Sequence, residues 1–142
     1  MIYKIYRKIA TVIAAPICIS YFFGKEVGCE YGLGVFDKIK IILTFHRNTK
    51  RIPSATTWLE HLRIAAEILK IPPTVIGDVI ECGCYKGGSS TNLSLICDIV
   101  GREIVICDSF EGLPTPEATD KIHYNIFRKR VNFCREVGYE VI

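Results

Sequence analysis

The sequence lacks the features that mark a repeat protein or a disordered chain. Its 142 residues contain no internal repeat and no low-complexity tract. Hydrophobic residues make up 49% of the chain and charged residues 23%, which is the composition of a globular protein. The length suits one domain of ordinary size.

The cysteines do not have the pattern of a disulfide framework or a zinc site. Their number, seven, is odd, and small disulfide-rich domains use an even number. Cys82 and Cys84 are too close together for a zinc half-site, and no second Cys/His pair follows. Buried free thiols explain the cysteines that end apolar runs, such as Cys97 and Cys107. We therefore expect a reducing, cytoplasmic location and no metal ligands in this chain.

The charge is unevenly distributed, but the sequence has no dense basic arm. Residues 1–51 hold nine Lys or Arg and three Asp or Glu, a net charge of +6, and residues 52–142 carry −3. Because the basic residues are scattered among apolar ones, nucleic acid is not the expected partner. Anionic lipid or another acidic surface fits this region better. We divide the chain into a basic, apolar N-terminal extension over residues 1–51 and a domain over residues 52–142.

No apolar run is long enough for an ordinary membrane-spanning helix. The longest uncharged run, Ile9–Phe23, contains Pro16 and falls short of the roughly 20 residues that a span requires. Three interpretations stay open: a membrane-associated helix, a buried helix and a cleaved signal. The aromatic end of the run, Tyr21–Phe23, favours an interfacial position, so contact with a membrane surface through residues 2–24 is one expectation.

Two helices are expected before the domain begins. After a glycine-containing loop over Gly24–Gly34, the apolar residues Phe36, Ile39 and Leu43 recur at helical spacing. A polar break over Asn48–Ser54 then separates this helix from the next.

Ser54 is expected to cap the second helix, which should run to about Leu69 before Pro72 and Pro73. Its apolar face is formed by Trp58, Leu62, Ala65, Ala66 and Leu69. His61, on the same helix, is expected to be partly exposed and not catalytic, because no partner is apparent nearby.

The domain begins with a pattern typical of a βαβ unit. A short strand around Val79 and Ile80 precedes a glycine loop, a helix over Ser89–Val100 ends at Gly101, and Ile104–Cys107 forms a second strand. Near-continuous apolar strands joined by a helix predict a parallel pair buried on both faces. The fold class is therefore α/β.

Two features at the ends of these strands predict an adenosine cofactor. Gly83, Gly87 and Gly88 follow the first strand, and glycines let the backbone approach a ligand closely. The helix that starts near Ser89 offers unpaired N–H groups to a carboxylate, with Ser89 and Ser90 as caps or donors. Asp108, at the end of the second strand, can accept both ribose hydroxyls.

Glu81 favours methyl transfer over hydride transfer. It ends the first strand within Glu-x-Gly-x-x-x-Gly-Gly, whereas nucleotide-dependent hydride enzymes use Gly-x-Gly-x-x-Gly. A carboxylate here would repel a pyrophosphate but can hold the ammonium of a methionine moiety and complement a sulfonium. A structural Glu81 that caps backbone amides remains an alternative.

The two motifs together resemble the macrocin O-methyltransferase family. They are Gly77–Ser90 and Asp108–Pro114, and the resemblance extends over about Ser54–Asp120. It implies an α/β, Rossmann-like class I methyltransferase fold and transfer of a methyl group from S-adenosylmethionine to a hydroxyl of a small molecule, often a sugar. It also implies magnesium, through residues not present in this chain.

The resemblance assigns cofactor contacts to both motifs. The methionine end would be lined by Glu81, Gly83, Tyr85, Gly87, Gly88, Ser89 and Ser90, and the ribose and adenine held by Asp108, Ser109 and Phe110.

The later part of the chain departs from the family pattern. Residues from Phe127 to Tyr139 resemble a basic amphipathic helix followed by the start of a third strand. Because two or three strands leave a doubly wound sheet incomplete, we expect a fragment whose catalytic residues are unknown. An NAD(P)-dependent oxidoreductase and a non-catalytic, membrane-proximal module with a vestigial cofactor fold are the alternatives, and a homo-oligomer stays open.

Overall fold

The computed structural model describes residues 2–109, and it describes side chains from Thr11 onward. Phe110, the turn after it, and the helix and third strand expected near the C-terminus lie outside the described residues. The elements follow the order α1 (Ile2–Phe22), the 3₁₀ turn η1 (Cys29–Tyr31), α2 (Val35–Arg51), α3 (Trp58–Lys70), β1 (Val79–Cys82), α4 (Gly88–Val100) and β2 (Ile104–Cys107). The described part is therefore mixed α/β, as expected.

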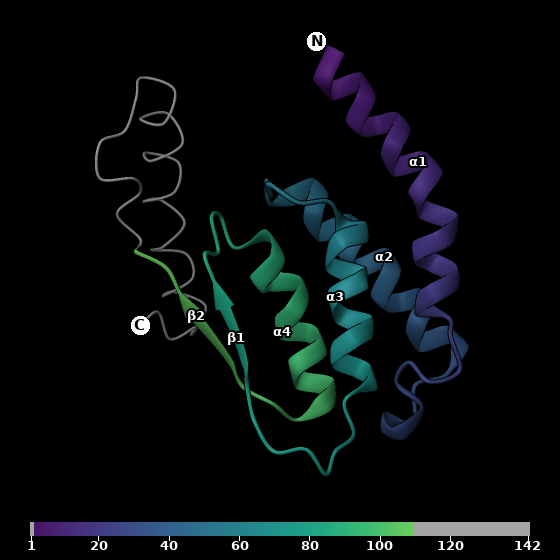
Figure 1. Ribbon diagram of the computed structural model, residues 1–142, viewed down its shortest axis with the longest axis vertical. Helices are drawn as coiled ribbons and strands as arrows, with labels where there is room; N and C mark the ends of the chain where they lie inside the picture. The colour runs from purple at the N-terminus through teal and green to yellow at the C-terminus, as the bar shows by residue number, and fades with distance from the viewer. Residues whose placement is uncertain (1, 110–142) are drawn as a thin grey trace.

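The elements form successive layers (Figure 1). The two strands lie on one side, α4 packs against them, α3 lies beyond α4, and α1 is at the opposite side. One apolar core joins the helices. Its fully buried members are Phe22, Val27, Phe45, Leu62, Ala65, Ala66 and Ile96. The core takes residues from both sides of the expected boundary at residue 51, which itself stays a prediction.

The first helix is longer than the uncharged run that predicted it, and Pro16 lies inside it. Phe22 is fully buried in the core, and the Tyr21 hydroxyl donates a 2.6 Å hydrogen bond to Glu67 on α3. The Phe22 ring and the Tyr21 hydroxyl therefore hold the end of α1 against α3, and the expected contact of residues 2–24 with a membrane surface stays a prediction. No helix among the described residues is long and apolar enough to cross a membrane.

The second helix is confirmed, but it faces the core differently from what its apolar spacing suggested. Its buried side chains are Lys38, Ile41 and Phe45. The side chains that identified the helix, Phe36, Ile39 and Leu43, are exposed. The helix also continues to Arg51, so the break expected from Asn48 begins later.

The third helix starts at a different cap from the one predicted. Thr57 is the N-cap, and its backbone N–H donates to the Glu60 carboxylate at 2.6 Å. This capping box, Thr-x-x-Glu, satisfies two backbone donors reciprocally, so it competes successfully with a cap at Ser54. Helix α3 ends at Lys70, before Pro72 as predicted.

The βαβ unit is confirmed. Strands β1 and β2 pair in parallel, with Glu81 opposite Ile106 and Cys82 opposite Cys107. Gly101 ends α4 in the left-handed conformation, with φ of 66°, which glycine adopts without strain.

Burial of both sheet faces was predicted and is wrong. Exposure alternates along β1, and Ile80 is 66% exposed, because one crossover helix covers only one face of a sheet. Cys97 is buried as expected. Cys107 was also expected to be buried but is exposed, because it points to the opposite face of the sheet from its buried neighbour Ile106. All six cysteines among the described residues are free.

Candidate functional site

The two predicted acids lie at the same edge of the sheet. Parallel pairing places the carboxyl ends of β1 and β2 side by side, and Gly83 N–H continues the ladder by donating to the Cys107 carbonyl at 2.7 Å. Asp108 follows directly after β2, and Glu81 is the third residue of β1. This is the edge where open parallel sheets bind ligands.

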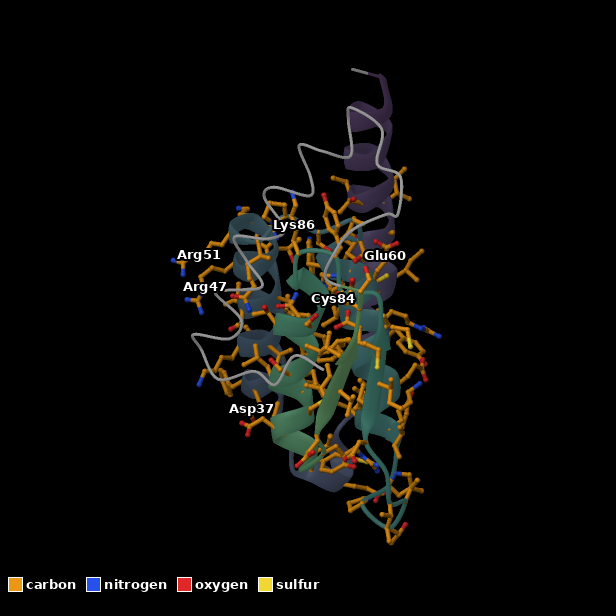
Figure 2. The ribbon with its side chains drawn as sticks, turned by 90° about the vertical axis from the view of Figure 1, so that its left-hand side faces the viewer. Asp37, Arg47, Arg51, Glu60, Cys84 and Lys86 are labelled. Atoms are coloured by element: carbon orange, nitrogen blue, oxygen red, sulfur yellow. The ribbon has the colours of Figure 1, made fainter. Side chains whose placement is uncertain are left out.

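Asp108 also organises the loop between β1 and α4. Its Oδ2 accepts hydrogen bonds from the backbone N–H of Cys84 at 2.8 Å and of Tyr85 at 3.3 Å. The sequence predicted a ligand contact for Asp108 and did not predict this loop contact. Because a carboxylate has about four acceptor positions, one side chain can serve the loop and a ligand. Figure 2 shows Cys84 near the ends of the strands.

Glu81 is only partly satisfied. Its Oε1 accepts a 2.5 Å hydrogen bond from the Ser89 hydroxyl on the first turn of α4. Its Oε2 is buried and has no hydrogen-bond partner among the described residues. A buried, unpaired carboxylate oxygen is costly, and a donor such as an ammonium group would satisfy it.

The loop backbone is held in conformations that glycine favours. Gly83 has φ of 84°, Gly87 has φ of 73° as the N-cap of α4, and Tyr85 has φ of 52°. A left-handed Tyr is uncommon and marks a backbone that its surroundings constrain. Apart from the two chain neighbours of Gly83, no atom of the described residues lies within 4 Å of a Cβ placed on it.

The start of α4 combines a close helix contact with an unsatisfied hydroxyl. A Cβ on Gly88 would lie 2.8 Å from the Ser54 Cβ, so Gly88 lets α4 approach the segment before α3. Ser90 is buried and its Oγ has no partner among the described residues. The first turn holds no acidic residue, so its free N–H groups favour an anion.

Lys86 is a site residue that the sequence analysis missed. It is only 6% exposed, and its Nζ lies 5.0 Å from the centre of the Tyr85 ring. Figure 2 shows Lys86 near Cys84 at this end of the molecule. The sequence feature that could have identified Lys86 is that it is the one basic residue of the motif Gly77–Ser90. A buried ammonium beside a helix N-terminus strengthens the local preference for anions.

His61 was expected to be partly exposed, and this is wrong. It is fully buried between α3 and α4, where Nδ1 lies 2.9 Å from the Asn92 amide nitrogen and Nε2 lies 2.6 Å from Thr56 Oγ1. Burial lowers the pKa of His61, partly opposed by Glu60. The side chain therefore stays neutral and ties the first turns of α4 to α3. Asn92 lies 31 residues further along the chain, so helical spacing alone did not reveal this partner.

Two of the residues predicted to contact the ribose and adenine lie at or beyond the end of the described part of the chain. Ser109 is the last described residue and is exposed, and Phe110 lies outside the described residues. Within residues 2–109, no group of three His, Cys, Asp or Glu side chains is arranged to hold a metal ion.

The comparisons with known proteins point to methyltransferases. A sequence profile described as Macrocin-O-methyltransferase (TylF) matches residues 55–139. Two curated proteins named Cobalt-precorrin-5B C(1)-methyltransferase, from Leptospira borgpetersenii serovar Hardjo-bovis strains JB197 and L550, are each 29% identical over 89 residues. That alignment covers 63% of this chain but 21% of each relative, so the chain spans about a fifth of their length. No solved structure matches.

Proposed function

Because the chain belongs to the macrocin O-methyltransferase family, we propose that it carries the cofactor-binding part of an S-adenosylmethionine-dependent O-methyltransferase. The single observation that carries this proposal is the buried Oε2 of Glu81, which has no partner among the described residues and lies next to a glycine loop. We further propose that the βαβ unit is the first part of a Rossmann-like class I fold. A parallel pair with its polar residues at the carboxyl edge supports this assignment.

The methionine end of the cofactor fits the loop between β1 and α4. Glu81 would accept the ammonium group through its unsatisfied oxygen and would complement the sulfonium charge at longer range. The carboxylate would face the N-terminus of α4, where the Ser90 hydroxyl lacks a partner and Lys86 supplies positive charge. Gly83, Tyr85 and Gly87 would shape the loop backbone around it.

The nucleoside end fits the tip of β2. Asp108 would hold the ribose hydroxyls while it holds the loop amides of Cys84 and Tyr85, so cofactor binding and loop order would be coupled through one carboxylate. Ser109 adjoins this position. We also assign Phe110 to the purine on the strength of the family motif. Held by these residues, the cofactor would supply an electrophilic methyl group for an acceptor hydroxyl.

The acceptor and its activation belong to the proposal as expectations. The family points to a hydroxyl of a small molecule, with a sugar or glycosylated metabolite as the first candidate. Magnesium and a general base would come from residues other than those described here. A cytoplasmic location is proposed because the cofactor is an intracellular metabolite.

Titration calorimetry with S-adenosylhomocysteine and with NAD tests the proposal. We expect the chain to bind S-adenosylhomocysteine and not NAD. Asp108→Asn retains a carbonyl oxygen for the loop amides but removes the charge, so affinity should fall by about 1–3 kcal/mol. Asp98→Asn, an exposed change on α4, is the matched control and should leave affinity unchanged. Equal binding of S-adenosylhomocysteine and NAD, or an unchanged affinity in Asp108→Asn, would contradict the assignment.

A further inference from the structure

One stripe of α2 combines exposed apolar residues with basic ones. Its members are Phe36, Ile39, Leu43, Arg47 and Lys50, spaced three or four residues apart along the helix. This spacing places all of them on one face. Phe36 is 86% exposed, Leu43 63% and Ile39 40%, and both basic residues are exposed. We call this set the α2 outer stripe.

The stripe does not contribute to the core. The opposite side of α2 buries Ile41 and Phe45 against the other helices. Single exposed apolar residues are common on protein surfaces, but a row of three within two helical turns indicates an interaction surface.

The charge of the stripe has one sign. It contains no acidic residue, and neither Arg47 nor Lys50 takes part in an ion pair within the described part of the chain. Figure 2 shows Arg47 pointing outward from α2. Asp37, the acid of this helix, lies off the stripe and accepts a 2.9 Å hydrogen bond from the Gly34 backbone. The stripe therefore complements an anionic surface.

We propose that the α2 outer stripe binds the surface of a membrane that contains anionic lipid. Phe36, Ile39 and Leu43 would enter the boundary between headgroups and acyl chains, while Arg47 and Lys50 would contact lipid phosphates. The single sign of charge on the stripe is the observation that favours anionic lipid, and a contact between protein copies is an outcome of the test below. The proposal assigns the contact to α2; Val12 and Ile17 on α1 are also exposed, and variants of these residues distinguish the two helices below.

Flotation of the full chain with lipid vesicles tests the proposal. We expect binding to vesicles of phosphatidylcholine with phosphatidylglycerol, little binding to phosphatidylcholine alone, and weaker binding at high salt. Combining Phe36→Ser with Leu43→Ser should reduce the bound fraction at least about tenfold. Combining Arg47→Glu with Lys50→Glu should have an effect of similar size.

Matched controls separate the stripe from general surface effects. Ile76→Ser removes an apolar residue that is 99% exposed, and Lys25→Glu reverses an exposed charge outside α2. Both should float like the unmodified chain. All variants should bind S-adenosylhomocysteine equally, so the result is independent of the proposed enzymatic function.

Three outcomes would overturn the proposal. One is flotation that depends on Val12→Ser with Ile17→Ser but not on the stripe, which would assign the contact to α1. Another is absence of flotation by the unmodified chain. The third is a dimer in sedimentation analysis that Phe36→Ser with Leu43→Ser converts to a monomer without any lipid effect, which would make the stripe a contact between copies.

Discussion

Two polar clusters lie at the first turns of α4, one toward α3 and one toward the strands, and each contains buried polar atoms. On the α3 side, His61 and Asn92 are fully buried, and each has hydrogen-bond partners. The Asn92 side-chain oxygen also accepts from Asn48 on α2 at 3.0 Å. On the strand side, Glu81 and Ser90 each retain a buried oxygen without a partner among the described residues.

The difference separates a cluster with a structural role from the cluster that we propose as the ligand site. A polar group that is buried and fully bonded contributes specificity and rigidity to a fold. A polar group that is buried and unsatisfied carries a cost of about 1–3 kcal/mol, which persists unless a ligand removes it. The same short helix turn therefore has one side that holds the protein together and one side suited to a ligand.

The largest effect on stability is expected from the satisfied cluster. His61→Ala would leave a cavity and remove one hydrogen-bond partner from each of Asn92 and Thr56, which should lower the free energy of unfolding by about 3 kcal/mol. Denaturant unfolding followed by the fluorescence of Trp58, the single tryptophan, measures this. Thr44→Ala, which removes a hydroxyl bonded to the Lys40 carbonyl on the exposed side of α2, should change stability by less than about 0.5 kcal/mol. Similar values for the two variants would remove the structural role of His61.

The unsatisfied cluster should respond in the opposite way. Glu81→Gln keeps an acceptor for Ser89 but removes a buried charge, so the free energy of unfolding should change by less than about 1 kcal/mol. Affinity for S-adenosylhomocysteine should fall by about 1.5–3 kcal/mol, the loss of a hydrogen bond to a charged group. Calorimetry and denaturation of the same variant test both parts. Glu103→Gln, at an exposed position before β2, is the control. A destabilised variant with unchanged affinity would return Glu81 to a purely structural role.

Gly88, at the start of α4, lies in close contact with Ser54 in the segment before α3. Gly88→Ala places a methyl group 2.8 Å from the Ser54 Cβ, and such overpacking typically costs about 1–3 kcal/mol. Adding Ser54→Gly removes the opposing atom, so the double variant should be less destabilised than the sum of the two single variants. Additive effects in denaturant unfolding would show that this contact does not set the position of α4.

The strands and their connecting helix were predictable because their signals are local. An apolar run, a glycine loop and Gly101 mark the βαβ unit, and the parallel pairing then places Glu81 and Asp108 at one edge. The Thr57–Glu60 capping box was also visible in the sequence, but Ser54 was preferred three residues too early.

Other features depended on contacts between distant residues. Nothing near His61 in the sequence indicates Asn92, which comes 31 residues later. The apolar spacing on α2 identified a helix but not its buried side, because Ile41 and Phe45 compete with Phe36, Ile39 and Leu43 for the core. The loop contact of Asp108 with Cys84 and Tyr85 likewise appears only once both strands are paired.

The pH dependence of stability should show the smallest effect and belongs to the satisfied cluster alone. Burial lowers the pKa of His61 below its ordinary value of 6.5, so the unfolded chain binds a proton more readily than the folded chain does. The contribution of His61 to stability is then fully present above about pH 6.5 and decreases as the pH falls below that value, by at most about 1.4 kcal/mol per pH unit. Denaturant unfolding between pH 7.5 and pH 5 should show this decline, and His61→Gln should flatten it. If the unmodified chain and His61→Gln lose stability equally over this range, the titrating group is another residue. The neutral, hydrogen-bonded state of His61 would then not distinguish the two sides of α4.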